Sequence, residues 1–116
     1  DKGTEPEGVA LLGLAGRTYA FIGLERTTTA AIGVFDITDP TDVAFIRLLT
    51  SPGDVSPEGL TAYTLDGRAY LAFSNEVSNS TTVVDLGSVP EPQSGALALA
   101  ALGLAALARR RMPPRR

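Results

Sequence analysis

The feature of this sequence that most constrains its fold is an internal repeat in its first 86 residues. Gly16-Arg17-Thr18-Tyr19 returns as Gly67-Arg68-Ala69-Tyr70, which sets an offset of 51 residues between the two copies. Pro6-Glu7-Gly8 returns at the same offset as Pro57-Glu58-Gly59. A register kept over so many positions indicates two copies of one structural unit.

Each copy has the pattern of short strands separated by turns. Runs rich in Thr, Val, Ile, Phe and Tyr predict strands at 9–14, 17–24, 31–37 and 43–49, and in the second copy at 60–65, 68–74 and 81–86. Ala15-Gly16 and Asp66-Gly67 predict tight hairpin turns between the first two strands of each copy. The second copy offers three strands, so we expect the N-terminal part of the chain to supply its fourth.

Four antiparallel strands in about 50 residues match a kelch-sized propeller blade. The sequence therefore predicts an all-β fold in which residues 1–86 are the last one or two blades of a β-propeller. Because a propeller needs about four to eight blades, we expect upstream blades of the same chain and a longer precursor that ends with these residues.

The C-terminal part of the sequence has a different character. A linker over residues 87–95 contains Pro90, Glu91 and Pro92, and residues 96–108 are Ala, Leu and one Gly without a charge. The prolines favour an extended, accessible segment around Glu91. The apolar run is followed by basic residues, namely Arg109, Arg110, Arg111, Arg115 and Arg116.

We expect residues 96–116 to form a short transmembrane helix and a basic cytoplasmic tail, because such cations set topology by remaining inside the cell. The alternative is a buried core helix. The apolar run gives about 20 Å of helix, whereas a bilayer core is about 30 Å thick. The absence of any polar face and the arginines behind the run favour the membrane.

This order of parts resembles the PEP-CTERM sorting signal of Gram-negative bacteria, in which a Pro-Glu-Pro motif, a short helix and a basic tail direct a secreted protein to an exosortase. The resemblance implies that Pro90, Glu91 and Pro92 are recognition residues of the sorting motif. It also implies export, an inner-membrane intermediate, and final placement at the cell surface or in the extracellular matrix.

The repeats carry a second resemblance. The segments EPEGVA, GRTYAFIGLER and VFDITDP, with SPEGL and SNEVSNSTTVVDL in the second copy, resemble the closing part of the choice-of-anchor I family. Those extracellular, propeller-like proteins carry interchangeable C-terminal anchors. We therefore expect a binding or matrix-associated module. The alternative is a metal-dependent hydrolase, phosphatase-like or esterase-like, whose catalytic residues lie upstream.

Composition excludes several kinds of chemistry within these residues. There is no Cys and no His, which rules out thiolate catalysis, a disulfide framework and a Ser-His-Asp triad formed here. All 13 acidic residues lie at or before Glu91, with five of the 10 basic residues, so the body is acidic and nucleic acid is not an expected partner. We identify no catalytic residue.

The repeated glutamates Glu7 and Glu58 are candidates for a metal site in the body. The first strand of each propeller blade lines the central channel, where carboxylates in successive blades would hold Ca²⁺ or another hard cation. The structural alternative is that each glutamate caps backbone amides at the start of its blade.

Glu25 and Glu76 also correspond in the repeat, and each follows an apolar strand. They would join the same rim as ligands of a metal or substrate. The structural alternative is a solvated ion pair, such as Glu25 with Arg17 or Arg68 of a neighbouring blade.

Overall fold

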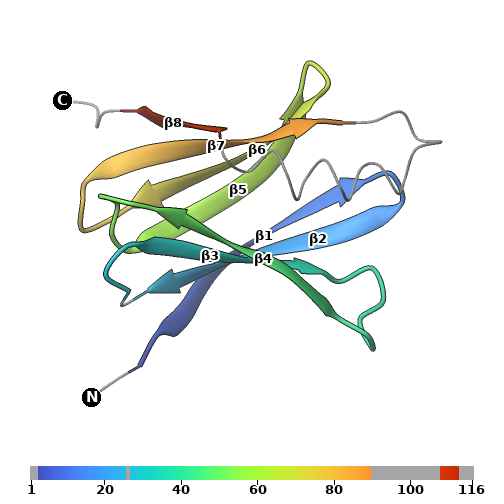
Figure 1. The fold of residues 1–116 in the computed structure, drawn as a ribbon, viewed down its shortest axis with the longest axis horizontal. Helices are drawn as coiled ribbons and strands as arrows, with labels where there is room; N and C mark the ends of the chain where they lie inside the picture. The colour runs from blue at the N-terminus through green and yellow to red at the C-terminus, as the bar shows by residue number, and fades with distance from the viewer. Residues whose placement is uncertain (1–2, 26, 90–107, 113–116) are drawn as a thin grey trace.

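The first repeat folds into a four-stranded antiparallel sheet, sheet A. The computed structural model describes residues 3–25, 27–89 and 108–112. The strands of sheet A are β1 (Glu5–Leu14), β2 (Arg17–Glu25), β3 (Ala30–Asp36) and β4 (Ala44–Ser51). They pair in chain order, each antiparallel to the next (Figure 1). All four predicted strands of this copy are confirmed.

The second repeat forms sheet B in the same way. Its strands are β5 (Pro57–Leu65), β6 (Arg68–Asn75) and β7 (Ser80–Ser88), again paired in chain order. The three strands expected for this copy are therefore confirmed. Like the predicted strands of sheet A, they begin within a few residues of the expected positions.

Two tight turns join the first strand of each sheet to its second. Ala15 and Gly16 have φ of 49° and 78°, and Asp66 and Gly67 have φ of 49° and 73°. Positive φ at both central residues defines the type I′ hairpin turn, whose twist matches that of the flanking strands. The predicted turns are confirmed.

A β-bulge lies at nearly the same place in both copies. The register of β1 against β2 shifts between Pro6 and Val9, and that of β5 against β6 shifts between Glu58 and Thr61, one residue later in the repeat. Gly8 and Gly59, with φ of 70° and 55°, take up the left-handed backbone that each bulge needs. The repeated Pro-Glu-Gly therefore marks a bend at the start of the first strand.

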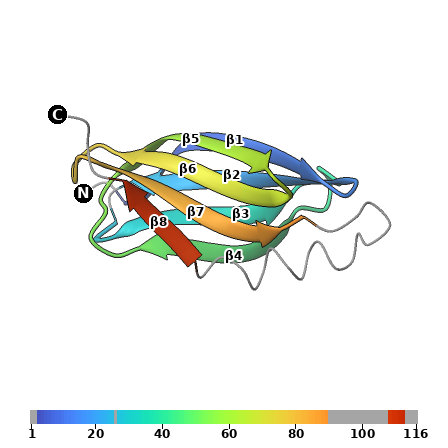
Figure 2. The same cartoon turned by 90° about the horizontal axis from the view of Figure 1, so that it is seen from above.

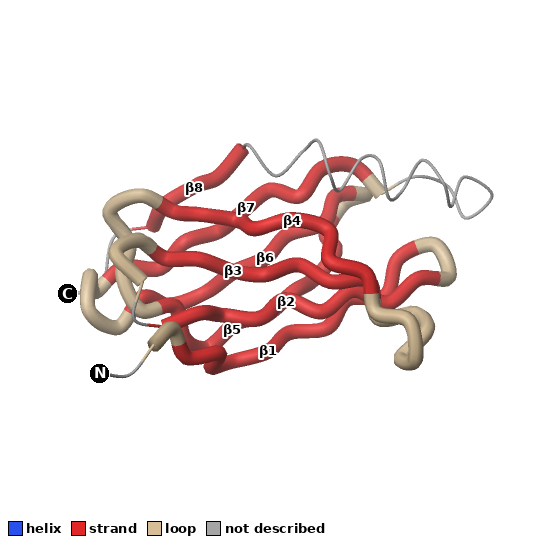
Figure 3. Tube along the Cα trace, turned by 60° about the horizontal axis from the view of Figure 1, so that its bottom comes forward, coloured by secondary structure: helices blue, strands red, loops and turns tan. Residues whose placement is uncertain are grey.

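The two sheets pack face to face around one hydrophobic core (Figure 2). Residues buried on the inner face of sheet A include Leu12, Phe21 and Val34, and they meet Leu71 and Phe73 of sheet B. The first strands, β1 and β5, make the most extensive contact between the sheets. Figure 3 shows them adjacent at one side of the pair.

The connection from β4 to β5 also ties the sheets together through the buried Asp54. Its carbonyl oxygen accepts a hydrogen bond from the N–H of Ala30 at 2.7 Å. Its carboxylate accepts hydrogen bonds from the hydroxyls of Ser51, Ser80 (2.9 Å) and Thr82 (2.6 Å). One residue thus links β3, β4 and β7, which fixes how sheet B lies on sheet A.

A fourth strand beside β7 comes from an unexpected place. The backbone of β8 (Ala108–Met112) pairs antiparallel with β7, from Thr81 opposite Met112 to Asp85 opposite Ala108. The sequence predicts that the N-terminal part of the chain supplies this strand, and the pairing of β8 corrects that prediction. The free edge of β7 presents unpaired N–H and C=O groups, and any extended segment of the chain that reaches it can satisfy them.

The predicted membrane helix falls mainly outside the described residues. Residues 90–107 and 113–116, which include Pro90, Glu91, Pro92, Arg115 and Arg116, are not described. The last residue of the predicted apolar helix, Ala108, and Arg109–Arg111 have strand backbone in β8 instead of a helix end and a tail. Within the described ranges, no helix is long and apolar enough to cross a membrane. The fold observed is all-β.

Candidate functional site

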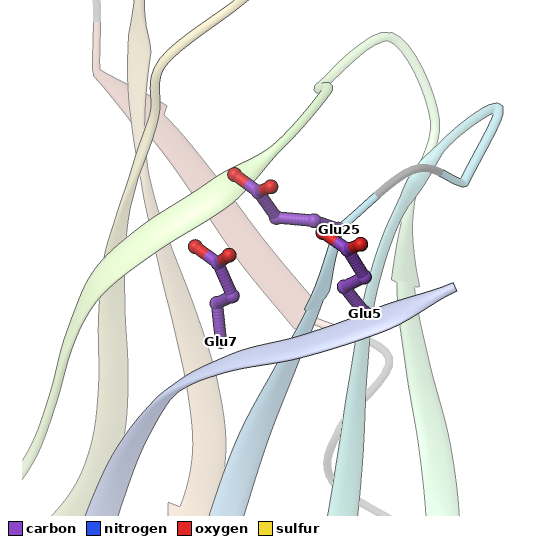
Figure 4. A group of neighbouring side chains, drawn as sticks. All are labelled: Glu5, Glu7 and Glu25. Carbon is purple, nitrogen blue, oxygen red and sulfur yellow. The ribbon is translucent and has the colours of Figure 1, made fainter. Parts of the chain in front are cut away.

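Glutamate side chains from both repeats converge at one end of the paired sheets. The carboxylates of Glu5, Glu7 and Glu25 lie within 4.8 Å of one another (Figure 4), and so do those of Glu25, Glu58 and Glu76. Glu25 belongs to both groups. The four glutamates singled out from the sequence are therefore brought together, and we call the five the glutamate cluster.

The strand pairing explains this convergence. In sheet A, Glu5 lies directly opposite Glu25 in the ladder between β1 and β2. In sheet B, Glu58 lies opposite Ser74 of β6, and Glu76 follows the last residue of that strand. Because β1 and β5 are adjacent in space, their N-terminal ends place the acidic residues of both sheets side by side.

Backbone contacts hold the sheet B members in place. The N–H of Glu76 donates to the carbonyl of Ser56 at 3.0 Å, which closes the end of β6 against the start of β5. The hydroxyl of Ser74 donates to the carbonyl of Glu58 at 2.8 Å beside the bulge. The bulge therefore aims the Glu58 side chain while its backbone stays anchored.

The electrostatics of the cluster are those of like charges held close together. A hydrogen bond with the carboxyl of Glu25 and the nearby charge of Glu76 raise the pKa of Glu58 above its ordinary value. A carboxyl group that shares a proton with a neighbour, or binds a cation, relieves this repulsion. Several carboxylate oxygens within reach of one another also suit a hard cation such as Ca²⁺. Calcium binding here stays a prediction.

The arginines at the hairpins have other partners than the one considered from the sequence. Arg17 forms an ion pair with Asp36 at 2.7 Å, and Arg68 pairs with Asp85 at 2.9 Å. Both pairs join the second and third strands of one sheet, and the alternative in which Glu25 pairs with Arg17 or Arg68 is not observed among the described residues. The repeat preserves this ion pair because each arginine starts the second strand and each aspartate lies near the end of the third.

Hydrogen bonds at Asp36 show how this ion pair is fixed. The hydroxyl and backbone N–H of Thr38 donate to the Asp36 carboxylate at 2.6 and 2.9 Å. These bonds, together with Arg17, lower the pKa of Asp36. The aspartate is thus held charged by its turn and its arginine, in a structural role.

Sequence reasoning missed one member of the cluster. Glu5 corresponds to Ser56 in the second copy, so a search for repeated carboxylates passes over it. The signal that would have found it is the strand register: a strand that starts at Glu5 and turns at Ala15-Gly16 must return to place Glu25 opposite Glu5.

The C-terminal end of sheet B leads directly into the proline motif. The N–H of Val89 donates to the carbonyl of Gly67 at 2.8 Å, so backbone hydrogen bonding to sheet B continues one residue beyond β7, to the residue before Pro90. A comparison with family models finds the PEP-CTERM protein-sorting motif at residues 88–111. The chain carries a PEP-CTERM sorting motif. The motif implies an exported protein that an exosortase processes and that associates with the cell surface of a Gram-negative bacterium.

The same comparison matches residues 1–40 to the choice-of-anchor I domain. Both family resemblances drawn from the sequence are therefore confirmed, that to the choice-of-anchor I domain over residues 1–40 and that to the PEP-CTERM motif over residues 88–111. The domain match ends within the first repeat, between β3 and β4. No curated protein and no solved structure matches the chain.

Proposed function

We propose that this chain is the C-terminal part of an exported β-propeller module that binds a ligand or matrix component at the cell surface after PEP-CTERM sorting. The observation that carries the proposal is the direct succession of a β-sheet body and the sorting motif. Strand β7 ends at Ser88, and the motif begins at the same residue. Removal of everything after Pro92 would leave β5, β6 and β7 intact.

The propeller architecture is supported by the arrangement of the two sheets. Sheet A is a four-stranded antiparallel meander, sheet B continues the same order with β5, β6 and β7, and the first strands of the two sheets make the most extensive contact between them. Successive propeller blades have this arrangement, with their first strands nearest the central axis. We assign residues 1–86 to two blades, 87–95 to the linker and 96–116 to the membrane helix and basic tail.

Membrane insertion has a consequence for β8. Arg109, Arg110 and Arg111 would stop transfer and remain in the cytoplasm, with Arg115 and Arg116 behind them, while the sheets lie on the far side of the membrane. These residues cannot pair with β7 at the same time. In the inserted precursor, β8 is therefore released and β7 presents a free edge.

The experiment that tests the sorting proposal is deletion of residues 90–116 from the protein in its native background. We expect the truncated protein to appear in the medium, because nothing holds it at the envelope, and immunoblots of cell and medium fractions would measure this. A matched variant replaces Arg109, Arg110 and Arg111 with Glu and should lose membrane arrest. Unchanged surface retention of the truncated protein would contradict the proposal.

A metal-dependent hydrolase is the second candidate, and the convergence of glutamate carboxylates favours it. Its catalytic residues would lie upstream, with the glutamate cluster contributing oxygen ligands for a cation. Hydrolysis of a phosphate monoester by the complete protein, lost on chelation and restored by Ca²⁺ or Mn²⁺, would favour this candidate. If the complete protein hydrolyses no phosphate monoester under any of these conditions, the hydrolase candidate is contradicted and the binding module is favoured.

A further inference from the structure

The outer face of sheet A, which points away from sheet B, is apolar across its full width. One row of paired residues crosses the four strands as Leu11, Ala20, Phe35 and Phe45. Leu11 is 59% exposed and Phe45 is 61% exposed, and the Phe45 ring meets Phe35 edge to face with centroids 5.5 Å apart. A sheet face of this kind normally packs against another layer.

A second row beside it has the same character. Val9 pairs with Ile22, Ile22 with Gly33, and Gly33 with Leu48. Val9 is 60% exposed and Leu48 is 47% exposed. Neither row contains a charged residue, so nothing on this part of the face offsets its contact with water.

The repeat tells what such a face is for. In sheet B, the row equivalent to Leu11, Ala20 and Phe35 is Ala62, Leu71 and Val84. Leu71 and Val84 are buried, and Ala62 packs against the core. These residues form the face that sheet B turns toward sheet A.

The second row agrees. Val9 and Ile22 correspond to Leu60 and Phe73, which also belong to the interface between the sheets. We call the face of sheet B that packs on sheet A its rear face. The rear face of sheet A is the one formed by the equivalent residues of the first repeat. The rear face of sheet B is covered by sheet A. The rear face of sheet A is also apolar. No described residue covers its exposed side chains, which are Val9, Leu11, Phe45 and Leu48.

We infer that a further repeat of the same polypeptide, preceding sheet A in chain order, covers this rear face. The occupant would be a third antiparallel sheet that turns toward sheet A a face like the one sheet A turns toward sheet B. That face carries buried apolar side chains, such as Ala10, Leu12 and Phe21. This inference rests on the proposed propeller architecture and identifies the contact by which the module continues.

Chain connectivity favours the same polypeptide over a second copy of the chain. Sheets A and B are joined by residues 52–56, and Asp54 in that connection accepts hydrogen bonds from residues of both sheets. A packing mode built around so short a covalent link belongs to neighbours in sequence. Continuing the same step toward the N-terminus places the next sheet on the rear face of sheet A.

Single cysteines test this inference, since the chain contains none of its own. Leu11→Cys and Phe45→Cys report on the rear face, with Leu48→Cys as a further position. Val77→Cys, in the connection between β6 and β7 and 67% exposed, is the matched control. Each variant is made in the natural polypeptide and, separately, in the 116-residue chain. Native samples are labelled with a bulky maleimide, and denatured samples give the total thiol.

In the natural polypeptide we expect positions 11 and 45 to react at least about tenfold more slowly than position 77, because a packed layer must open before the reagent enters. In the 116-residue chain the cysteines at positions 11, 45 and 77 should react at similar rates. Equal rates in the natural polypeptide would overturn the inference. Protection that disappears on dilution, with twice the expected mass by light scattering, would overturn it in favour of a second copy. Labelling is read on total protein, so failure of sorting does not affect the result.

Discussion

Gly23 lies where the backbones of β1, β2 and β5 approach one another closely. A Cβ atom at this position would lie 2.7 Å from the carbonyl oxygen of Glu7 and 3.2 Å from that of Pro57. Backbone atoms cannot move aside as a flexible side chain does. The absence of a side chain at Gly23 therefore permits β1, β2 and β5 to meet at the glutamate cluster.

We predict that Gly23→Ala destabilises the protein by about 1–3 kcal/mol, because the added methyl group must push the β1 or β5 backbone away. The free energy of unfolding from urea titrations measures this. Gly13→Ala is the matched control, since its Cβ would meet nothing closer than the Arg17 carbonyl oxygen at 3.9 Å. Equal effects of the two substitutions would contradict the close-approach explanation.

Glu58 gives a prediction for pH dependence. Its pKa is raised in the folded protein by hydrogen bonding to Glu25 and by the charge of Glu76. The folded state therefore binds the proton more tightly than the unfolded chain does. The resulting stabilisation is present at pH below the ordinary glutamate pKa and is lost as the pH rises through the raised pKa.

We predict that Glu58→Gln raises the melting temperature above that of wild type at pH 7. The melting temperature of the variant should also change less with pH between pH 4 and 7. Thermal melts across that range, at low salt, measure the effect. Asp66→Asn is the control, because Asp66 lies in the hairpin turn at the other end of sheet B and an Asn tolerates its φ of 49°. If the melting temperature of Glu58→Gln changes with pH in parallel with that of wild type, electrostatic repulsion within the glutamate cluster does not destabilise the folded protein.

At the scale of elements, the β4 to β5 connection is the part that fixes the two sheets together. Asp54 is 1% exposed, and its carboxylate accepts bonds from three hydroxyls on both sides of the interface. Asn75 extends the network by donating to the Thr82 hydroxyl at 3.0 Å. A buried carboxylate with this many donors is satisfied, but each donor depends on it.

We predict that Asp54→Ala costs about 2–3 kcal/mol of stability, because it removes the acceptor of three buried hydroxyls and leaves a cavity. Asp54→Asn should cost less, because its amide oxygen still accepts. Asp42→Ala in the exposed loop before β4 is the control and should be within about 0.5 kcal/mol of wild type. A loss at Asp54 no larger than at Asp42 would contradict the bridging role. Denaturant unfolding measures all three.

Local sequence was enough to predict the strands and turns, but not the contacts between sheets. Alternating apolar residues and the Gly-containing turns located seven strands, since both signals act over a few residues. The Arg17 partner was missed because strand register decides it: Tyr19 lies opposite Asp36, which brings the third strand's aspartate within reach. Asp54 was not singled out from the sequence, because the burial of this polar residue depends on how the two sheets pack together.

The candidate site was predictable as a set of residues and not as a geometry. The repeat singled out Glu7, Glu58, Glu25 and Glu76, and the structure places all four in one cluster. Glu5 broke the repeat and was overlooked. The pairing of Ala108–Met112 with β7 could not be predicted, because the composition of those residues indicates membrane topology and carries no strand pattern.

At the scale of the whole molecule, the two sheets alone make a small protein with one face uncovered. We predict that residues 1–89 expressed alone unfold with a free energy of no more than about 3–5 kcal/mol, because so few residues bury a limited core. Urea unfolding followed by circular dichroism measures this. A cooperative transition that survives high temperature would contradict the incomplete-propeller proposal.

The hydrogen bond from Val89 to Gly67 fixes the point at which the chain leaves sheet B after β7. It holds the chain at the hairpin end of sheet B, where Arg68 lies opposite Ser88, whereas Glu58 and Glu76 lie at the far end of the same strands. A strand of nine residues spans about 30 Å. Any segment that begins at Pro90 therefore starts at the opposite end of sheet B from the glutamate carboxylates, about 30 Å away from them.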